Sequence, residues 1–283
     1  MKAVHPHVGF MQGRLSPLVE GKIQAFPWAE WDQEFAIARG LGLTRMEWTM
    51  DQERIGENPL MTAEGRARIG ELVAANGIII PSLTGDFCMQ APFWKAHGQA
   101  RAELVALFAD VVRACAEVGI GLIVVPLVDN GSLTSHDDRD ALTGTLLKLH
   151  PLLTQTGVKI AFESDFAPAP LAALIADFPA ASFGINYDMG NSASLGWNPD
   201  EELPLLAPRI VNVHVKDRLL GGTTVALGQG AADLARQFAL LRQAGYAGNY
   251  ILQTARATDG DHAGTIRRYA DFVTAQLEHP DAA

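Results

Sequence analysis

Short runs of hydrophobic residues alternate along the chain with longer segments in which hydrophobic residues recur at helical spacing. Eight of the short runs are rich in β-branched and aromatic residues, which predicts buried strands. Their bounds are Val8–Met11, Arg45–Trp48, Ile78–Leu83, Leu122–Pro126, Lys159–Glu163, Phe183–Tyr187, Ile210–Val215 and Tyr250–Gln253. They lie roughly 25 to 45 residues apart, which is the length of one strand–helix unit.

The segments between these runs carry the signals of helices. Arg101–Val118 has one continuous apolar face and stops before a glycine. Thr62 is placed to cap a helix that ends near Asn76, and Asn198-Pro199 is a typical helix start. We expect two further helices, over Ala231–Ala244 and Asp261–Leu277.

Eight strands that alternate with eight helices form either a closed barrel or an open, doubly wound sheet. The strand count favours the barrel, and no GxGxxG motif opens a helix after an early strand. Runs such as Ile78–Ile80 are apolar at successive positions, as in strands buried on both faces. No linker interrupts the pattern. The sequence therefore predicts one α/β domain over residues 1–283, a single parallel eight-stranded (β/α)8 TIM barrel.

Composition and charge narrow the class of protein. Of the 283 residues, 48% are hydrophobic and 19% are charged, which is typical of a globular chain. The formal charge is -10 and the Lys and Arg residues are scattered, which argues against a nucleic-acid partner. The two cysteines, Cys88 and Cys115, are too few for a disulfide framework.

Cellular location is predicted from what the sequence lacks. Residues 1–10 do not have the charged start and long apolar run of a signal peptide. Apolar runs such as Leu122–Val128 are too short to span a bilayer. We therefore expect a soluble cytoplasmic protein without a membrane partner.

Two long connections follow predicted strands, at about residues 12–31 and 84–99. In a barrel both lie at the rim that carries active sites, and both contain aromatic residues. They are interpreted either as a lid over a small ligand or as loops that their aromatic residues anchor to the barrel. Completion of these loops by a second subunit would make the protein a homo-oligomer.

Polar side chains end four consecutive strands near the carboxyl rim: Glu163, Asp188, His214 and Gln253. Side chains at these positions of a barrel point into the site. Two carboxylates, one imidazole and one amide oxygen suit a single divalent ion, with Mn²⁺, Mg²⁺ or Co²⁺ favoured over Zn²⁺. The alternative is that each residue only forms hydrogen bonds at the rim.

Several motifs over nearly the whole chain resemble those of the xylose-isomerase-like barrels. This superfamily contains sugar and sugar-phosphate isomerases and epimerases and also includes endonuclease IV. The motifs are Val8-Gly9-Phe10-Met11-Gln12-Gly13-Arg14-Leu15, Met46-Glu47-Trp48, Phe162-Glu163, Asn186-Tyr187-Asp188-Met189-Gly190-Asn191, His214-Val215-Lys216-Asp217-Arg218 and Leu227-Gly228-Gln229-Gly230.

The resemblance implies a metal-dependent isomerase or epimerase that acts on a small carbohydrate: a sugar, sugar acid, cyclitol or sugar phosphate. The four family ligands, Glu, Asp, His and Glu, correspond to Glu163, Asp188, His214 and position 253. This chain departs from the pattern because position 253 is Gln, whose amide can ligate a metal but does not accept a proton near neutral pH. Two-base epimerisation by the two family glutamates is therefore in doubt.

Three routes remain open at such a site. One-base chemistry on a single face of the substrate needs Glu163 alone. Alternatively Glu47, His97 or Lys216 replaces the missing base, or the reaction is a metal-assisted elimination or hydrolysis. In each route the metal would polarise a carbonyl or hydroxyl pair of the substrate.

Other polar residues near the predicted rim are candidates to bind substrate. Lys216 and Arg218 would hold a carboxylate or phosphate, or would pair with neighbouring acids. Gln12, Arg14, His97 and Arg256 are further candidates, and for Arg14 the alternative is to brace the long first loop. Glu47, apart from catalysis, could form a salt bridge in the barrel mouth.

The glycines of Leu227-Gly228-Gln229-Gly230 precede a predicted helix. Backbone N–H groups at such a place bind phosphate in many barrels, but a turn that needs positive φ explains the glycines more simply.

Three other functions compete with an isomerase. A metal-assisted lyase or dehydratase needs only one base beside the metal. An abasic-site endonuclease shares the fold, but the acidic charge and the single histidine in the four-residue set count against it. The fourth class is a barrel that binds a sugar without catalysis.

Overall fold

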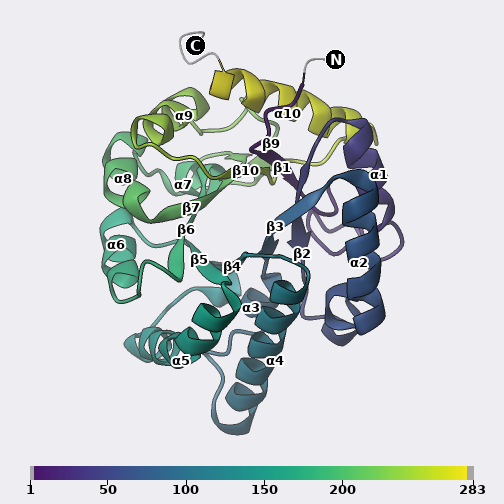
Figure 1. Ribbon diagram of the computed structural model, residues 1–283. Helices are drawn as coiled ribbons and strands as arrows, with labels where there is room; N and C mark the ends of the chain where they lie inside the picture. The colour runs from purple at the N-terminus through teal and green to yellow at the C-terminus, as the bar shows by residue number, and fades with distance from the viewer. Residues whose placement is uncertain (1–2, 279–283) are drawn as a thin grey trace.

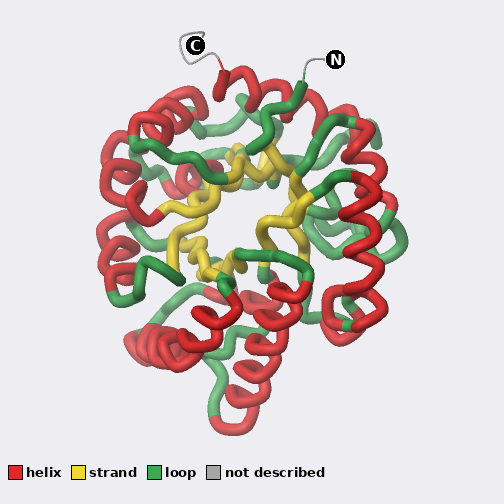
Figure 2. The backbone as a smooth tube through the Cα atoms, viewed as in Figure 1, coloured by secondary structure: helices red, strands yellow, loops and turns green. Residues whose placement is uncertain are grey.

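A computed structural model describes residues 3–278, in which eight parallel strands close into a barrel (Figures 1 and 2). The order around the barrel is β1-β10-β7-β6-β5-β4-β3-β2. The strands are β1 (Val8–Met11), β2 (Arg45–Thr49), β3 (Ile79–Thr84), β4 (Leu122–Leu127), β5 (Lys159–Ser164), β6 (Phe183–Asp188), β7 (Ile210–Val215) and β10 (Asn249–Leu252). The predicted barrel is confirmed.

Helices surround the barrel, as the red outer ring of Figure 2 shows. They are α1 (Gln33–Gly40), α2 (Ala63–Asn76), α3 (Asp86–Gln90), α4 (Gly98–Glu117), α5 (His136–Thr156), α6 (Pro168–Ala176), α7 (Met189–Leu195), α8 (Pro199–Leu206), α9 (Leu234–Gln243) and α10 (His262–Glu278). Four short 3-10 turns, Ile55–Glu57, Pro59–Met61, Asp129–Gly131 and Ala207–Arg209, and an antiparallel ribbon of β8 (Asp217–Arg218) and β9 (Thr224–Val225) complete the described chain.

The predicted helix caps act as expected. The Thr62 hydroxyl accepts a hydrogen bond from the Gly65 N–H, and the Asn198 side chain accepts one from the Asp200 N–H. Helix α9 begins later than predicted because Asp233 caps it through the Arg236 N–H. Within residues 3–278, no helix is both long and apolar enough to cross a membrane.

The aromatic residues of the two long rim loops are packed against the barrel wall. Phe26 is fully buried, and its ring centroid lies 4.8 Å from that of Trp28 and 5.5 Å from that of Trp48. In the second loop, Phe93 and Trp94 are buried, and Phe93 packs against Phe108 of α4. The structure therefore favours anchored loops over a lid built from these aromatic residues.

A buried carboxylate that the sequence analysis did not single out fastens the first loop. Glu34 of α1 accepts hydrogen bonds from the Gly13 N–H at 2.8 Å, the Leu15 N–H at 2.9 Å and the Ser16 hydroxyl at 2.8 Å. One side chain thus satisfies three buried donors of the segment that follows β1. These hydrogen bonds hold residues 13–16 in place, and the later part of the same loop lines the pocket.

Replacing Glu34 with alanine is expected to lower the free energy of unfolding by about 3 kcal/mol, because three buried donors lose their acceptor. Chemical denaturation followed by circular dichroism measures the change. Glu53→Ala is the control, since Glu53 is exposed and its ion pair with Lys22 is a surface one. Equal stabilities of the two variants would contradict this role of Glu34.

Candidate active site

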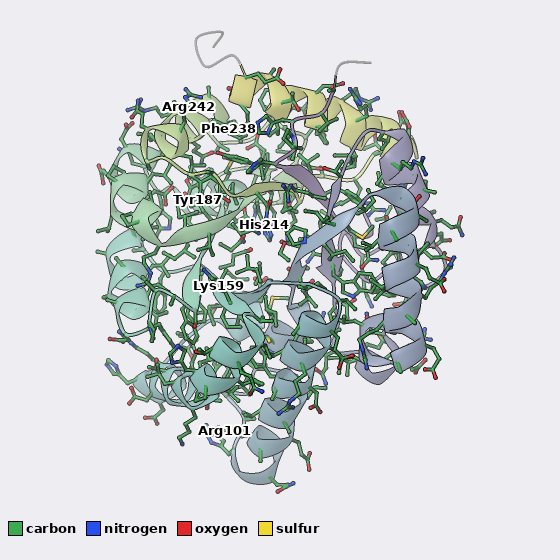
Figure 3. All side chains as sticks on the ribbon, in the orientation of Figure 1. Arg101, Lys159, Tyr187, His214, Phe238 and Arg242 are labelled. Atoms are coloured by element: carbon green, nitrogen blue, oxygen red, sulfur yellow. The ribbon has the colours of Figure 1, made fainter. Side chains whose placement is uncertain are left out.

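The ends of β5, β6 and β7 bring three predicted residues together. Ligand atoms of Glu163, Asp188 and His214 all lie within 4.8 Å of one another, and all three side chains are buried. Asp188 and His214 are neighbours because they are register partners on adjacent strands. Figure 3 shows His214 among the side chains in the middle of the barrel.

His214 is oriented by a carboxylate below the cluster. Its Nε2 lies 2.7 Å from Glu47 Oε1, while its Nδ1 lies 3.1 Å from Glu163 Oε2 and 4.0 Å from Asp188 Oδ2. Glu47 in turn accepts a hydrogen bond from the Ser82 hydroxyl at 2.7 Å. Because an ionised carboxylate only accepts, Nε2 donates to Glu47, and Nδ1 is the nitrogen that faces the other two acids.

This arrangement fits a divalent metal. A histidine that binds a metal ion through one ring nitrogen usually donates the N–H of the other to a carboxylate, a carbonyl group or water, as His214 does to Glu47. Burial lowers the pKa of His214, but the charges of Glu47 and Glu163 outweigh it and raise that pKa to about 10. The carboxylates therefore stabilise positive charge at the imidazole, and a cation at Nδ1 would take over the role of that proton.

Two asparagines that the sequence analysis did not select hold the Glu163 carboxylate. Asn186 Nδ2 donates to Oε2 at 2.8 Å, and Asn191 Nδ2 donates to Oε1 at 2.6 Å. Burial raises the pKa of Glu163, but His214, Lys216 and Asn186 together bring it below its ordinary value. Glu163 is therefore a carboxylate that these contacts hold in place and keep ionised. The sequence could have indicated Asn186, because it lies two positions before Asp188 on the same strand and such residues point to the same face of the sheet.

Lys216 and Gln253 complete the cluster. Lys216 Nζ lies 3.3 Å from Asp188 Oδ2 and 3.1 Å from Gln253 Oε1. The amide oxygen of Gln253 thus shares the Lys216 ammonium group with the Asp188 carboxylate. Gln253 Nε2 donates in the other direction, to Gln24 Oε1 at 2.9 Å.

A pocket of about 570 Å³ opens above the cluster. Glu163, Lys216, Arg218 and Gln253 line it among the predicted residues, and Asp86 lines it as well. Such a volume is that of a small-molecule site. Asp86 and Gln24 were missed, because the short helix α3 that Asp86 begins and the loop that holds Gln24 have no hydrophobic pattern that fixes their path.

The structure does not bring the other substrate-binding candidates to this pocket. Arg14 donates to the Thr254 and Ile23 carbonyls, and Arg256 donates to the Gly13 and Ser16 carbonyls. Gln12 is fully buried and its Oε1 accepts from the Thr49 N–H. His97 is exposed at the start of α4. The bracing role considered for Arg14 agrees with its contacts.

The glycine-rich turn binds the carboxylate of Asp217, a side chain of the same protein. The N–H groups of Gly228, Gly230 and Ala232 donate to the Asp217 carboxylate at 2.9, 2.8 and 3.1 Å. Gly228 has φ +82°, so the turn also requires the left-handed backbone. These contacts favour the turn explanation of the glycines over a phosphate site, since Asp217 already satisfies the N–H groups.

Replacing Glu47 with glutamine is expected to weaken divalent-metal binding by about 10- to 100-fold, because the hydrogen bond that orients His214 is altered. Titration calorimetry with Mn²⁺ measures the affinity. Glu57→Gln, on the exposed surface, is the control and should leave it unchanged. Unaltered affinity in Glu47→Gln would show that Glu47 does not orient a ligand.

Comparison with known proteins places this geometry in a family. The profile of the family described as "Xylose isomerase-like TIM barrel" matches residues 35–275. The chain belongs to this family. The resemblance seen in the sequence is thus confirmed.

Relatives of this xylose isomerase-like barrel include sugar epimerases. The L-ribulose-5-phosphate 3-epimerase UlaE of Escherichia coli is 25% identical over 279 residues, which cover 90% of this chain and 93% of UlaE. The IOLI protein, solved with a binding zinc atom, superposes with TM-score 0.74 at 16% identity over 96% of this chain and 98% of its own. D-psicose 3-epimerase, solved in the presence of D-fructose, superposes with TM-score 0.71 at 13% identity over 96% and 98%. The two structures show the same fold.

Proposed function

We propose that this chain is a divalent-metal-dependent isomerase or epimerase of a small carbohydrate, which moves a proton at a carbon next to a carbonyl group. The observation that carries the proposal is the buried cluster of Glu163, Asp188 and His214, of which Glu163 lines a pocket of about 570 Å³. The epimerase names of several relatives support the reaction class.

In this proposal the metal is held by Glu163, Asp188, His214 and the Gln253 amide oxygen. The bound ion would supply Lewis acidity toward a substrate carbonyl and an adjacent hydroxyl. Glu163 would take the proton from the neighbouring carbon, because it is ionised and faces the pocket. Lys216 would keep Asp188 and Gln253 aligned through its two hydrogen bonds.

We further propose that the substrate is an uncharged sugar. The two cationic residues that line the pocket are already bonded to protein acceptors: Lys216 to Asp188 and Gln253, and Arg218 to Asn191 and the Gly222 carbonyl. The pocket wall also carries the carboxyl groups of Asp86 and Asp165. A phosphate would meet the charge of these acids, and both cationic residues already donate hydrogen bonds to protein acceptors.

The test is solvent exchange across matched substrates. The enzyme with added Mn²⁺ is incubated in D₂O with D-fructose, D-psicose, D-tagatose or D-sorbose, and with the 5-phosphates of L-ribulose and L-xylulose. We expect deuterium at the carbon next to the carbonyl of a free ketose, at least about tenfold faster than in either phosphate. A product lighter by one water would assign a dehydratase, and no exchange in any sugar would refute the proposal.

A further inference from the structure

One buried carboxyl group in the pocket has no part in the reaction proposed above. Asp86 is the first residue of α3, directly beyond β3, and its side chain is 7% exposed. It lines the same pocket as Glu163, but it comes from a different strand end. Among residues 3–278, no Lys or Arg lies in ion-pair contact with it, and the Arg14 charge acts on it only from a longer distance.

A glutamine connects Asp86 with the amide that ends β10. Gln24 Nε2 donates to Asp86 Oδ2 at 2.5 Å, and Gln24 Oε1 accepts from Gln253 Nε2 at 2.9 Å. Arg14 Nη2 donates to the same Gln24 oxygen at 3.2 Å and fixes the orientation of the amide. The Asp86 carboxyl group is therefore linked through Gln24 to the Gln253 side of the pocket, which it also lines.

On the Gln253 side of the pocket, this chain lacks the glutamate that the family pattern has and that could carry a proton. Gln253 does not exchange protons near neutral pH, whereas a carboxyl group does. Burial raises the pKa of Asp86, against the hydrogen bond from Gln24, and the charges of Asp51 and Glu163 add to the rise, which brings the pKa to about 7. A group with such a pKa is suited to both donate and accept a proton.

The other acids of the pocket are less suited to this task. Asp165 is only partly buried, and its Oδ2 accepts a hydrogen bond from the Ser132 hydroxyl. Asp129 is exposed to solvent on the 3-10 turn beyond β4. Asp86 is the buried one of the three, and it alone is connected to Gln253 through Gln24.

We propose that Asp86 is the second proton carrier of the site and serves the face of the substrate carbon opposite to the face that Glu163 serves. This inference rests on the proposed epimerase function. The C–H bond breaks as its proton passes to Glu163, and the electron pair moves onto the carbonyl oxygen to form an enediolate. The Asp86 carboxylic acid then gives its proton to the other face, the carbonyl reforms, and both carboxyl groups return to their starting states by exchange with solvent.

The test compares the two members of one epimer pair in separate experiments. Mn²⁺-loaded wild type and Asp86→Asn are incubated in D₂O with D-fructose and with D-psicose, or with the pair from the panel above that the wild type converts. We expect Asp86→Asn to lose interconversion by at least about 100-fold, while the epimer whose hydrogen faces Glu163 still exchanges within about tenfold of the wild-type rate. Asp137→Asn, an exposed aspartate at the start of α5, should match wild type.

The asymmetry between the two epimers is the decisive readout, because a purely structural role would slow both exchange rates alike. Equal losses, or interconversion within about tenfold of wild type, would overturn the assignment of Asp86. Asp86→Glu, which keeps a carboxyl group but displaces it, provides a second variant if Asp86→Asn does not fold: relative to wild type, we expect exchange of the epimer whose hydrogen faces Asp86 to fall at least about tenfold more than exchange of the other epimer, and equal falls would overturn the inference. A wild type that exchanges no ketose would instead refute the proposed function and this inference with it.

Discussion

Replacing His214 with alanine is expected to abolish stable metal binding. The variant loses the one nitrogen ligand of the cluster and leaves Glu47 and Glu163 buried without the imidazole that contacts both of them. We expect the affinity for Mn²⁺ to fall by more than about 100-fold, a larger loss than for a residue that only orients a ligand. Metal content after gel filtration, determined by mass spectrometry, measures the effect.

The matched control for this prediction is His136→Ala. His136 begins α5 and is exposed, far along the chain from the strand ends that form the cluster. Its variant should retain the metal of the wild type. If His214→Ala also retained stoichiometric metal, the cluster would be a hydrogen-bonded structural network and the metal would bind elsewhere.

Replacing Glu163 with glutamine is expected to lower solvent exchange by at least about 10³-fold, because the amide does not take up a proton. The substitution also disturbs the cluster, since both Glu163 oxygens accept from asparagine amides and the new NH₂ group opposes one of these donors. The exchange rate is therefore measured by NMR at saturating Mn²⁺, beside a separate titration of metal affinity.

This pair of measurements separates two roles of Glu163. Loss of exchange at full metal occupancy identifies Glu163 as the base, whereas recovery of exchange on adding metal would leave it only the role of a ligand. Glu103→Gln, on the exposed face of α4, is the control and should behave as wild type. Wild-type exchange by Glu163→Gln at all metal concentrations would contradict its place in the reaction.

Much of the fold follows from the hydrophobic pattern. The bounds of the eight barrel strands agree with prediction to within one residue, because strands buried on both faces appear as compact apolar runs bounded by polar turns. The parallel arrangement of the strands then places their carboxyl ends at one rim. Polar residues at those ends are therefore neighbours in space, which is why the sequence alone suffices to select Glu163, Asp188 and His214.

The loops limit what the sequence predicts of the site. Asp86 and Gln24 lie in segments without periodic pattern, and only the folded path brings Gln24 between Asp86 and Gln253. Arg14 and Arg256 were expected near a substrate, yet they bond backbone carbonyls of the loops instead. In the glycine-rich turn, the sequence pattern does not reveal that Asp217 supplies the anion from thirteen residues away.

The most direct test of a metal-dependent proton transfer is the rate of deuterium incorporation into the preferred ketose before and after removal of divalent metal by a chelator. We predict a fall of at least about 100-fold after chelation and recovery when Mn²⁺ or Co²⁺ is added back. An exchange rate that is the same in the metal-free and metal-loaded protein would contradict a metal-dependent reaction.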